Sequence, residues 1–465
     1  METLELSTPE GAPAAFTVAL RPDPRLELRV SEGEGPPRHY RLADQGHAAH
    51  LDLFAALAKD FGLRLPLSRE TPPPSSPGPP PLRPLLTEAV SPKILYGYGD
   101  PCVVRVGEGD YRLLVTSNDA PDAFPILTSS DLESWRLTGF VFPKGQAPAW
   151  TLTGPDVSDF WAPELHRVGG EWWVCFTART HDRTLAIGLA RAAAPDGPFL
   201  ADAAPIIGGG VIDAHILVDE AGAPWLIWKQ DDNDRWPRAL MALLHGRPQL
   251  VSVLFTDVDA RTAAFLLALW PWARELEPMR QFFVLQTLVE AVGEDLGGFA
   301  LWLSATRPQL SEAEAARADD ILTALRTRIF AQRLSPDGRG LEGEPVVILQ
   351  NDLPWEGHLI EGVWITREGG RYHLIYAGND FSTGRYGIGA GVADAPAGPY
   401  RKRAEVFLRS TADWWGPGHP SVATGPDGHP HMFLHGFRPG EAGYKAFRAL
   451  LTTPIRFDGD ALAFR

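Results

Sequence analysis

Apolar and polar positions follow two different rhythms along the chain, and the change falls near residue 90. Beyond it, short runs rich in Val, Ile, Tyr, Phe and Trp are separated by Gly, Asp and Pro. This pattern predicts an all-β domain, as a sandwich, a barrel or a propeller. Earlier, Ala15–Arg21 and Leu26–Val30 alternate like strands, and His47–Phe61 has apolar residues at helical spacing. Residues 1–70 are therefore expected to form a small α+β unit.

A proline-rich segment separates the two patterns. The run Thr71-Pro-Pro-Pro-Ser-Ser-Pro-Gly-Pro-Pro-Pro-Leu82 offers few backbone N–H groups to a sheet and favours a semi-extended chain. We therefore expect a linker over residues 71–90 and a second domain over residues 91–465.

One motif recurs five times in the second domain and distinguishes between the β architectures. Each copy is a glycine turn followed by an aromatic or aliphatic strand. Three of the four intervals between the turn glycines are 52–61 residues, whereas the third interval is 148 residues. Repeats with room for four short strands predict a five-bladed β-propeller. The turn glycines are Gly109, Gly170, Gly222, Gly370 and Gly428.

The long third interval contains extra sequence with a different period. Residues 260–292 and 311–325 have helical spacing, and Ser311-Glu-Ala-Glu314 is typical of a capped helix start. We predict a helical insertion over residues 236–327 in the third blade, with strands resuming at Arg328.

Polar residues recur at a fixed distance from the repeated turns. Because the innermost strand of a blade leads into its first hairpin, residues nine positions before each turn glycine should form one ring at one end of the axis. Three of them are carboxylates, and crowded, buried carboxylates have separated pKa values, as an acid and a base for glycosidic cleavage require. A tryptophan there would offer an apolar platform to a sugar ring. The five residues are Asp100, Trp161, Asp213, Glu361 and His419.

Plainer interpretations exist for each of these residues alone. Asp100 precedes a proline and has the pattern of a turn residue, and Asp213-Ala-His215 fits a β-bulge with a solvated acid. Arg385 follows the fourth turn, where it could contact a sugar or simply be solvated. The run Asp231–Asp234 resembles a cation-binding loop but lacks EF-hand spacing, so a solvated turn is the simpler interpretation. A propeller that binds a ligand without chemistry also stays open.

Six segments in order make residues 94–440 resemble glycoside hydrolase family 43, whose members are five-bladed propellers acting on arabinose-, xylose- and galactose-containing glycans. One departure is Val363, where the family often has proline after the Glu-Gly pair. The segments are Gly99-Asp-Pro101, Ser129-Ser-Asp-Leu-Glu-Ser-Trp135, Trp161-Ala-Pro-Glu164, Ile212-Asp-Ala-His215 followed by Asp219 and Gly222, His358-Leu-Ile-Glu-Gly362, and Gly416-Pro-Gly-His-Pro-Ser421.

The resemblance implies roles for the carboxylates. Asp100 would be the general base, Glu361 the general acid, and Asp213 the residue that tunes the pKa of the acid and orients the sugar. His419 would lie near the axis, where some members hold a water or a calcium ion, so a structural calcium is left open although no metal or cofactor is needed for the chemistry. Candidate substrate contacts are Trp161, His215, Arg385 and His419.

Charge and composition disfavour several classes of binding partner and structure. The chain has 58 acidic and 43 basic residues and a net charge of −15, which disfavours nucleic acid and anionic lipid. Cys102 and Cys175 are too few for a disulfide framework. The segment Ala263–Trp272 is too short to span a bilayer. Because the first residues have neither a basic nor an apolar signal segment, we expect a cytoplasmic protein.

We therefore expect an inverting glycoside hydrolase that removes terminal pentoses from short glycans, as a β-xylosidase or an α-L-arabinofuranosidase. A galactose- or galactofuranose-directed exo-glycosidase is the alternative within the same chemistry, and a non-catalytic glycan-binding propeller is the alternative outside it. The sequence does not decide the sugar, the linkage or the oligomeric state.

Overall fold

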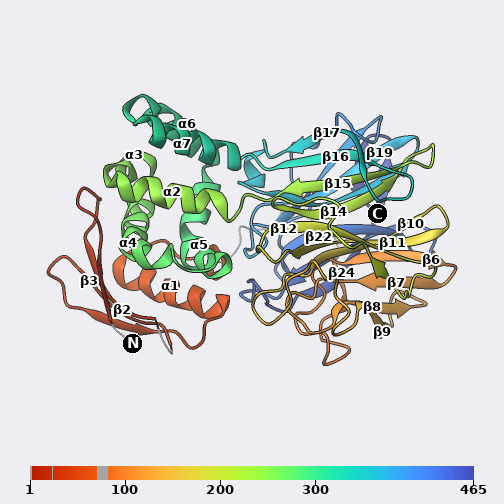
Figure 1. Cartoon of the computed structure of the whole chain (residues 1–465), viewed down its shortest axis with the longest axis horizontal. Helices are drawn as coiled ribbons and strands as arrows, with labels where there is room; N and C mark the ends of the chain where they lie inside the picture. The colour runs from red at the N-terminus through yellow and green to blue at the C-terminus, as the bar shows by residue number, and fades with distance from the viewer. Residues whose placement is uncertain (1–2, 23–24, 71–81) are drawn as a thin grey trace. The chain divides into compact units, whose positions relative to one another are not determined.

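The computed structural model describes residues 3–22, 25–70 and 82–465, which belong to two compact units (Figure 1). One unit combines residues 1–72 with residues 232–326, and we call it the mixed unit. The other combines residues 73–231 with residues 327–465, and we call it the five-sheet unit. Within the described residues, no helix is both long and apolar enough to cross a bilayer.

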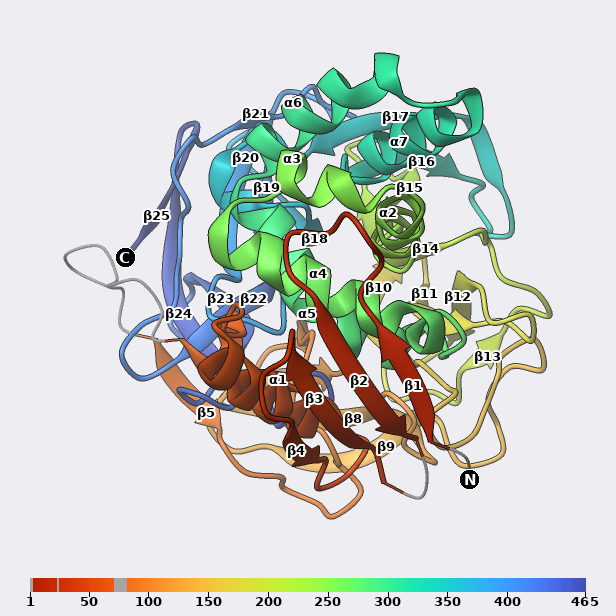
Figure 2. The same cartoon turned by 90° about the vertical axis from the view of Figure 1, so that its left-hand side faces the viewer.

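The mixed unit begins with a four-stranded antiparallel sheet and continues with helices from both of its segments (Figure 2). The sheet order follows the chain, and helix α4 packs on strands β1 and β2. The elements are β1 (Leu4–Ser7), β2 (Phe16–Arg21), β3 (Glu27–Glu32), β4 (Arg38–Arg41), α1 (His47–Phe61), η1 (Leu67–Arg69), α2 (Arg235–Gly246), η2 (Pro248–Leu250), α3 (Val251–Leu254), α4 (Asp257–Ala273), α5 (Pro278–Glu294), α6 (Leu296–Thr306), η3 (Arg307–Gln309) and α7 (Glu312–Ala324).

The two segments of the mixed unit share one hydrophobic core. Phe265 of α4 is fully buried and contacts Phe16 of β2 and Phe54 of α1, with ring centroids 5.5 and 6.3 Å apart. The sequence treats residues 1–70 and the insertion as separate additions, whereas the structure buries the apolar sides of both against each other. The expected cap of the last helix is present, because Ser311 and Glu314 form a reciprocal capping box.

The five-sheet unit consists of consecutive antiparallel sheets, each in chain order. The four-stranded sheets are β6–β9, β10–β13, β14–β17 and β18–β21, and β22–β25 gains β5 as an additional strand paired with β24. The bounds are β5 (Arg83–Leu86), β6 (Cys102–Gly107), β7 (Asp110–Leu114), β8 (Ala123–Ser129), β9 (Arg136–Phe142), β10 (Trp161–Val168), β11 (Glu171–Arg179), β12 (Leu185–Ala192), β13 (Leu200–Ala201), β14 (Val211–Val218), β15 (Pro224–Gln230), β16 (Arg328–Leu334), β17 (Leu341–Gln350), η4 (Pro354–Glu356), β18 (Ile360–Glu368), β19 (Arg371–Gly378), β20 (Gly387–Ala393), β21 (Arg401–Lys402), β22 (Trp415–Thr424), β23 (Pro430–Phe437), β24 (Ala449–Asp458) and β25 (Ala461–Phe464).

The first strands of the five sheets form a closed ring. Each contacts the first strand of the next sheet, and β22 contacts β6. Every repeated turn glycine lies at the hairpin between the first and second strands of its sheet. The prediction of a mostly-β fold made of repeated sheets is confirmed, and the ring agrees with the predicted blades. The insertion leaves the third sheet between β15 and β16, and β16 begins at Arg328.

The predicted linker, residues 71–90, lies partly outside and partly inside the described part of the chain. Residues 71–81 lie outside the described part of the chain. Beyond them, Arg83–Leu86 is not linker but the edge strand β5, with Leu86 paired to Leu450 of β24. The linker was therefore predicted too long at its C-terminal end.

The two separate cores predict the result of a deletion. A chain starting at residue 82, with residues 232–326 replaced by a short glycine–serine loop, should give a β-type circular dichroism spectrum and one cooperative thermal transition. Deleting residues 232–326 alone should make residues 3–70 protease-sensitive, because they lose their shared core. A five-sheet chain without a cooperative transition, even after exposed apolar residues are replaced, would contradict the division.

Candidate active site

Five residues with left-handed backbone conformation line up on the ring of first strands. Their φ angles lie between 45° and 57°, a region that residues other than glycine rarely adopt. Bulges interrupt strand pairing close to four of them. We call these five residues the axial ring. They are Asp100, Ala162, Asp213, Gly362 and His419.

The axial ring differs from the predicted ring at two positions. Trp161 and Glu361 each precede the left-handed residue by one position, so a constant count from the turn glycine is wrong by one in the second and fourth sheets. The shift has a steric reason at Gly362, because a Cβ atom there would lie 2.9 Å from Nδ1 of His419. Glu361 is therefore not itself a member of the axial ring, but the residue directly before the ring member Gly362.

Asp100 is held as a carboxylate by several donors. Its Oδ2 accepts a hydrogen bond from Thr116 Oγ1 at 2.5 Å, and its Oδ1 lies 2.8 Å from a guanidinium nitrogen of Arg448. Burial alone would raise the pKa of Asp100. The positive charge of Arg448, the neighbouring His419 and His435, and the Thr116 hydroxyl together outweigh burial, so the pKa falls below the usual aspartate range. Asp100 is suited to accept a proton from water.

Glu361 has the opposite character. Its side chain is 10% exposed, its Oε1 accepts a hydrogen bond from the Tyr386 hydroxyl at 2.9 Å, and its Oε2 lies 3.2 Å from Lys229 Nζ. Burial raises the pKa of Glu361 to about 7, and the negative charge of Asp213 acts in the same direction. Lys229, the Tyr386 hydrogen bond and His419 oppose this rise without cancelling it. Glu361 can therefore carry a proton near neutral pH.

Asp213 lies close to the other members of the site. Its Oδ2 accepts a hydrogen bond from the Gly362 N–H at 3.0 Å. Burial raises the pKa of Asp213, and the charge of Asp100 adds to the rise, while His419 and Lys229 counter it. Because its charge also raises the pKa of Glu361, Asp213 stands where a tuning residue is needed.

His419 is directed toward two of the carboxylates. Its Nδ1 lies 3.4 Å from Asp100 Oδ1 and 4.0 Å from Asp213 Oδ2. Burial would lower the pKa of His419, but the surrounding carboxylates raise it. Calcium needs six to eight oxygen ligands. Among the described residues, the carboxylates that face Nδ1 are those of Asp100 and Asp213, which are too few by themselves to fit the calcium that the sequence left open.

Trp161 is half-buried at the edge of the site and is held in one orientation. Its indole N–H donates to Asn118 Oδ1 at 3.0 Å, and the Arg179 guanidinium carbon lies 5.7 Å from the ring centroid. These contacts favour the predicted sugar platform. Arg385 is also half-buried, and its backbone N–H donates to Thr383 Oγ1. Its contact with a substrate stays a prediction.

His215 does not have the predicted freedom to bind substrate. Its Nδ1 lies 2.8 Å from Glu164 Oε2, and its Nε2 accepts the Ile365 N–H at 3.2 Å. Burial lowers its pKa to about 3, so the ring is neutral. Both nitrogens are engaged inside the protein, and the assignment of His215 as a substrate contact is corrected to a structural one.

The same interior network contains the one potential metal-ligand group found among the described residues. Ligand atoms of Glu164, His166 and Cys175 lie within 4.8 Å of one another. Glu164 Oε2 also lies 2.8 Å from His166 Nε2, and Cys175 Sγ donates to the Ala214 carbonyl. The ligand atoms of Glu164, His166 and Cys175 are already engaged in hydrogen bonds within the protein, so the group is better described as a hydrogen-bond network than as a metal site.

A second repeated position supports the axial ring, and the sequence prediction missed it. The position lies seven residues after each turn glycine, in or just beyond the second strand, and at three of the five places its side chain accepts a backbone N–H of the axial ring. Thr116 Oγ1 accepts the Ala162 N–H at 2.8 Å, and Thr177 Oγ1 accepts the Asp213 N–H at 3.2 Å. His435 Nδ1 accepts the Asp100 N–H at 3.1 Å. We call this set the supporting ring, and its members are Thr116, Thr177, Lys229, Ala377 and His435.

Counting forward from the turn glycines would have found the supporting ring, because a lysine and a histidine at the end of apolar strands are conspicuous. No comparable signal marks Tyr386 or Arg448, which lie in loops. The acidic run after β15 also needs a correction, because Asp231 is not solvated. Its side chain is 8% exposed and its Oδ1 lies 3.0 Å from Lys229 Nζ.

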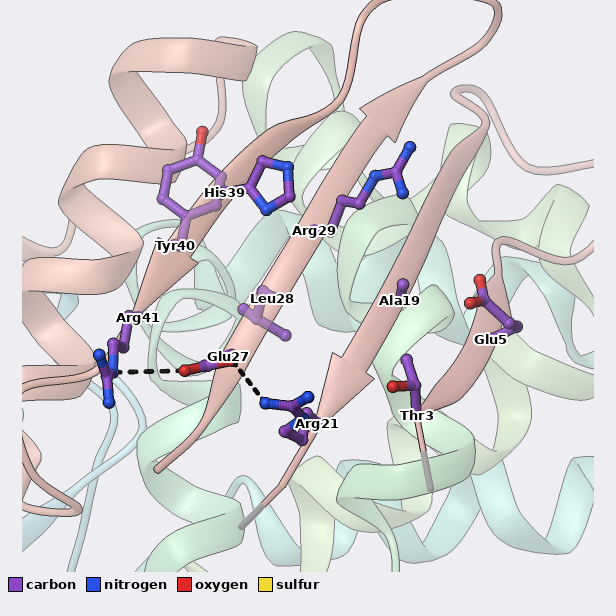
Figure 3. A pocket seen from close by; sticks show the side chains of 10 residues that line it. All are labelled: Thr3, Glu5, Ala19, Arg21, Glu27, Leu28, Arg29, His39, Tyr40 and Arg41. Atoms are coloured by element: carbon purple, nitrogen blue, oxygen red, sulfur yellow. Dashed lines mark hydrogen bonds and ion pairs between the residues drawn. The ribbon is translucent and has the colours of Figure 1, made fainter. Parts of the chain in front are cut away.

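The mixed unit has a cavity of a different kind (Figure 3). It has a volume of about 560 Å³ and lies on strands β1–β4. Its central acid Glu27 pairs with Arg21 at 3.3 Å and with Arg41 at 3.4 Å. The lining contains three arginines and two glutamates, so positive charge exceeds negative charge in this cavity, unlike the carboxylate-rich site of the five-sheet unit.

Comparison with known proteins points to one family. The profile described as "Glycosyl hydrolases family 43" matches residues 91–252 and 316–462. A curated protein from Humicola insolens, "Xylosidase/arabinosidase 43A", is 35% identical over 66 residues, which is 14% of this chain and only 20% of the length of that relative.

Solved structures show the same fold. A thermostable family-43 glycoside hydrolase aligns with a TM-score of 0.55 at 24% identity, covering 79% of this chain and 93% of that chain. A Bacteroides thetaiotaomicron structure titled endo-1,4-beta-xylanase aligns with a TM-score of 0.52 at 18% identity, covering 80% and 95%. A xylan beta-1,4-xylosidase from Bacillus halodurans aligns with a TM-score of 0.51 at 17% identity, covering 80% and 55%.

The clash distance at Gly362 predicts a sensitive position. Gly362→Ala should push His419 and disturb the hydrogen bond to Asp213, and a displacement of about 1 Å costs on the order of 100-fold in activity. Gly428→Ala is the matched control, since Gly428 also has a positive φ but open space around its Cβ position. Steady-state rates and melting temperatures of both variants would separate the two effects. Equal activity in the two variants would show that the Gly362 contact is unimportant.

Proposed function

The chain belongs to glycosyl hydrolase family 43, and from this membership we propose that it is an inverting exo-glycosidase that releases terminal pentoses from short glycans. The substrate would be a β-xyloside or an α-L-arabinofuranoside. The observation that carries the proposal is the difference in protonation between Asp100 and Glu361. One carboxyl group is stabilised as an anion, and the other keeps a proton until about pH 7.

This difference supplies both proton transfers of an inverting hydrolysis. Asp100 removes a proton from a water that attacks the anomeric carbon, and Glu361 gives its proton to the leaving oxygen. Burial, assisted by the negative charge of Asp213, raises the pKa of Glu361 and so favours its protonated form. Arg448 and Thr116 keep Asp100 ionised. No cofactor takes part in these steps.

The sign of the pH dependence follows from the two roles. Glu361 must be protonated, so activity should be present below about pH 7 and should fall as the pH rises through the pKa of this group. Asp100 must be ionised, and its lowered pKa keeps it so throughout the mildly acidic range. The expected profile is a broad plateau with its basic limb near neutrality.

The pentose specificity is supported by the printed name of the Humicola insolens relative and by the Trp161 platform at the site. A non-catalytic glycan-binding protein is the competing function. It is disfavoured because a binding site has no use for an ionised and a protonated carboxyl group side by side.

A panel of nitrophenyl pentosides and hexosides should show turnover on the xyloside or the arabinofuranoside. Proton NMR during the first minutes of hydrolysis should then show release of the anomer opposite to that of the substrate. Turnover confined to galactosides would replace the proposed sugar, and initial release of the same anomer would contradict inversion. No turnover on any glycoside would favour the binding function.

Substitution of the two carboxylates should separate the acid from the base. Glu361→Gln should reduce hydrolysis of natural glycosides by about 10²–10⁴-fold, and it should cost less with activated aryl leaving groups that need little protonation. Asp100→Asn should abolish turnover on both substrate types, because every substrate needs the activated water. Steady-state rates on matched alkyl and aryl glycosides check this. An equal loss on both types in Glu361→Gln would remove Glu361 from the acid role.

A further inference from the structure

Lys229 is a buried cation next to the acid of the proposed reaction. It lies on β15, and its side chain is 1% exposed. Its Nζ lies 3.2 Å from Glu361 Oε2 and 3.0 Å from Asp231 Oδ1. Burial would lower the pKa of Lys229, but the carboxylates Asp231, Glu361 and Asp213 raise it, so the amine stays charged. The buried ammonium group of Lys229 therefore stabilises negative charge on the glutamate oxygen that it contacts, Glu361 Oε2.

Lys229, like Ala377, differs from the other three members of the supporting ring. The equivalent residues Thr116, Thr177 and His435 each accept the backbone N–H of the axial-ring residue in the next sheet. An ammonium group has no lone pair and cannot do this. The Gly362 N–H is instead satisfied by Asp213 Oδ2, and Lys229 reaches the preceding side chain, Glu361.

The two oxygens of Glu361 therefore have unlike partners. Oε2 faces an ammonium that only donates, whereas Oε1 faces the Tyr386 hydroxyl, which can donate or accept. A proton on Oε2 would point at Nζ and displace it. A proton on Oε1 can be accepted by the phenol oxygen of Tyr386. The lower-energy position for the acidic proton is therefore Oε1.

We infer that Lys229 is a positioning residue for the general acid: it holds Oε2 of Glu361, so that Oε1 carries the proton and delivers it to the substrate. This inference rests on the proposed function and adds to it the oxygen and the residue that selects it. In the reaction, the Oε1–H bond breaks as the proton joins the leaving oxygen. The glycosidic C–O bond cleaves as the water oxygen forms a new bond to the anomeric carbon, and Asp100 takes a proton from that water. The Tyr386 hydroxyl then donates to the new carboxylate at Oε1, while Lys229 keeps Oε2.

Several other charged or titratable groups face these atoms and have to be considered. Asp213 and His419 act on Glu361 with opposite signs, and Tyr386 also experiences the charges of Asp100 and Asp213. His358 interacts with Lys229, and burial lowers its pKa to about 4, so it adds no charge near neutrality. None of these groups is removed by the substitutions proposed next.

The basic limb of the kcat/KM profile is the measurement that tests the role of Lys229, because it reports the protonation of Glu361 in the free enzyme. In Lys229→Met, an opposite charge within hydrogen-bonding distance of Oε2 is lost, so the limb should move up by about 1–3 pH units. In Asp231→Asn, a negative charge near the pair is lost, so the limb should move down. The rate at pH 5–6 in Lys229→Met should fall more on alkyl glycosides than on activated aryl glycosides.

Lys402→Met is the matched control. Lys402 is a second lysine that contacts a buried glutamate, and its own side chain is 10% exposed. Its Nζ lies 2.7 Å from Glu356 Oε1, to which the Tyr376 hydroxyl also donates. Its loss should lower the melting temperature without moving the limb. A folded Lys229→Met enzyme with an unmoved limb would overturn the inference. If this variant does not fold, an unmoved limb in Asp231→Asn would overturn it. Absence of any activity in the unmodified enzyme would instead contradict the proposed function.

Discussion

The backbone N–H groups of the axial ring have to be satisfied inside the five-sheet unit, and this requirement organises the site. A buried N–H without a partner costs free energy comparable to a lost hydrogen bond. At Asp100, Ala162 and Asp213 the partner is a side chain of the supporting ring, and this leaves the ring side chains free for other contacts. At Gly362 the partner is Asp213 itself. The same hydrogen bond therefore places Asp213 beside Glu361, the proposed general acid.

The turn glycines were sufficient to predict the repeated sheets, because each marks a hairpin at the same place in its sheet. They also located Asp100, Asp213 and His419 on the axial ring. The same count was wrong by one at Trp161 and Glu361, since whether a bulge holds its left-handed residue one position later depends on packing against the neighbouring sheet. Gly362 shows this dependence, because its missing side chain leaves room for His419 from the next sheet.

The parts that could not be predicted depend on contacts between distant segments. Nothing in residues 1–70 reveals that Phe16 packs on Phe265 of the insertion, because each segment separately has an amphipathic pattern that is compatible with an independent unit. The assignment of His215 failed for a similar reason. Its neighbour Asp213 points into the site, whereas His215 lies two positions further along the strand and meets Glu164 in the interior. The sequence shows the spacing, but the partner that fixes a histidine comes from another sheet.

Two glutamates of the five-sheet unit show how the number of donors separates a carboxylate that is held ionised from a carboxyl group that can hold a proton. Glu356 is fully buried and accepts from Lys402 with both oxygens, from the Tyr376 hydroxyl, and from the backbone N–H groups of Asp352 and Leu353. Both carboxylate oxygens of Glu356 therefore accept more than one hydrogen bond.

Glu361 has the same partner types but fewer of them, with one lysine contact on Oε2 and one tyrosine contact on Oε1. Burial is similar, so the missing donors leave a lone pair that can hold a proton, and the nearby charge of Asp213 makes it favourable to do so. Two glutamates that each have a lysine and a tyrosine partner therefore differ in how easily they hold a proton, and the less saturated one is the glutamate that we propose as the acid. The backbone donors that complete Glu356 are the N–H groups of Asp352 and Leu353, directly before η4, whereas the Gly362 N–H next to Glu361 donates to Asp213.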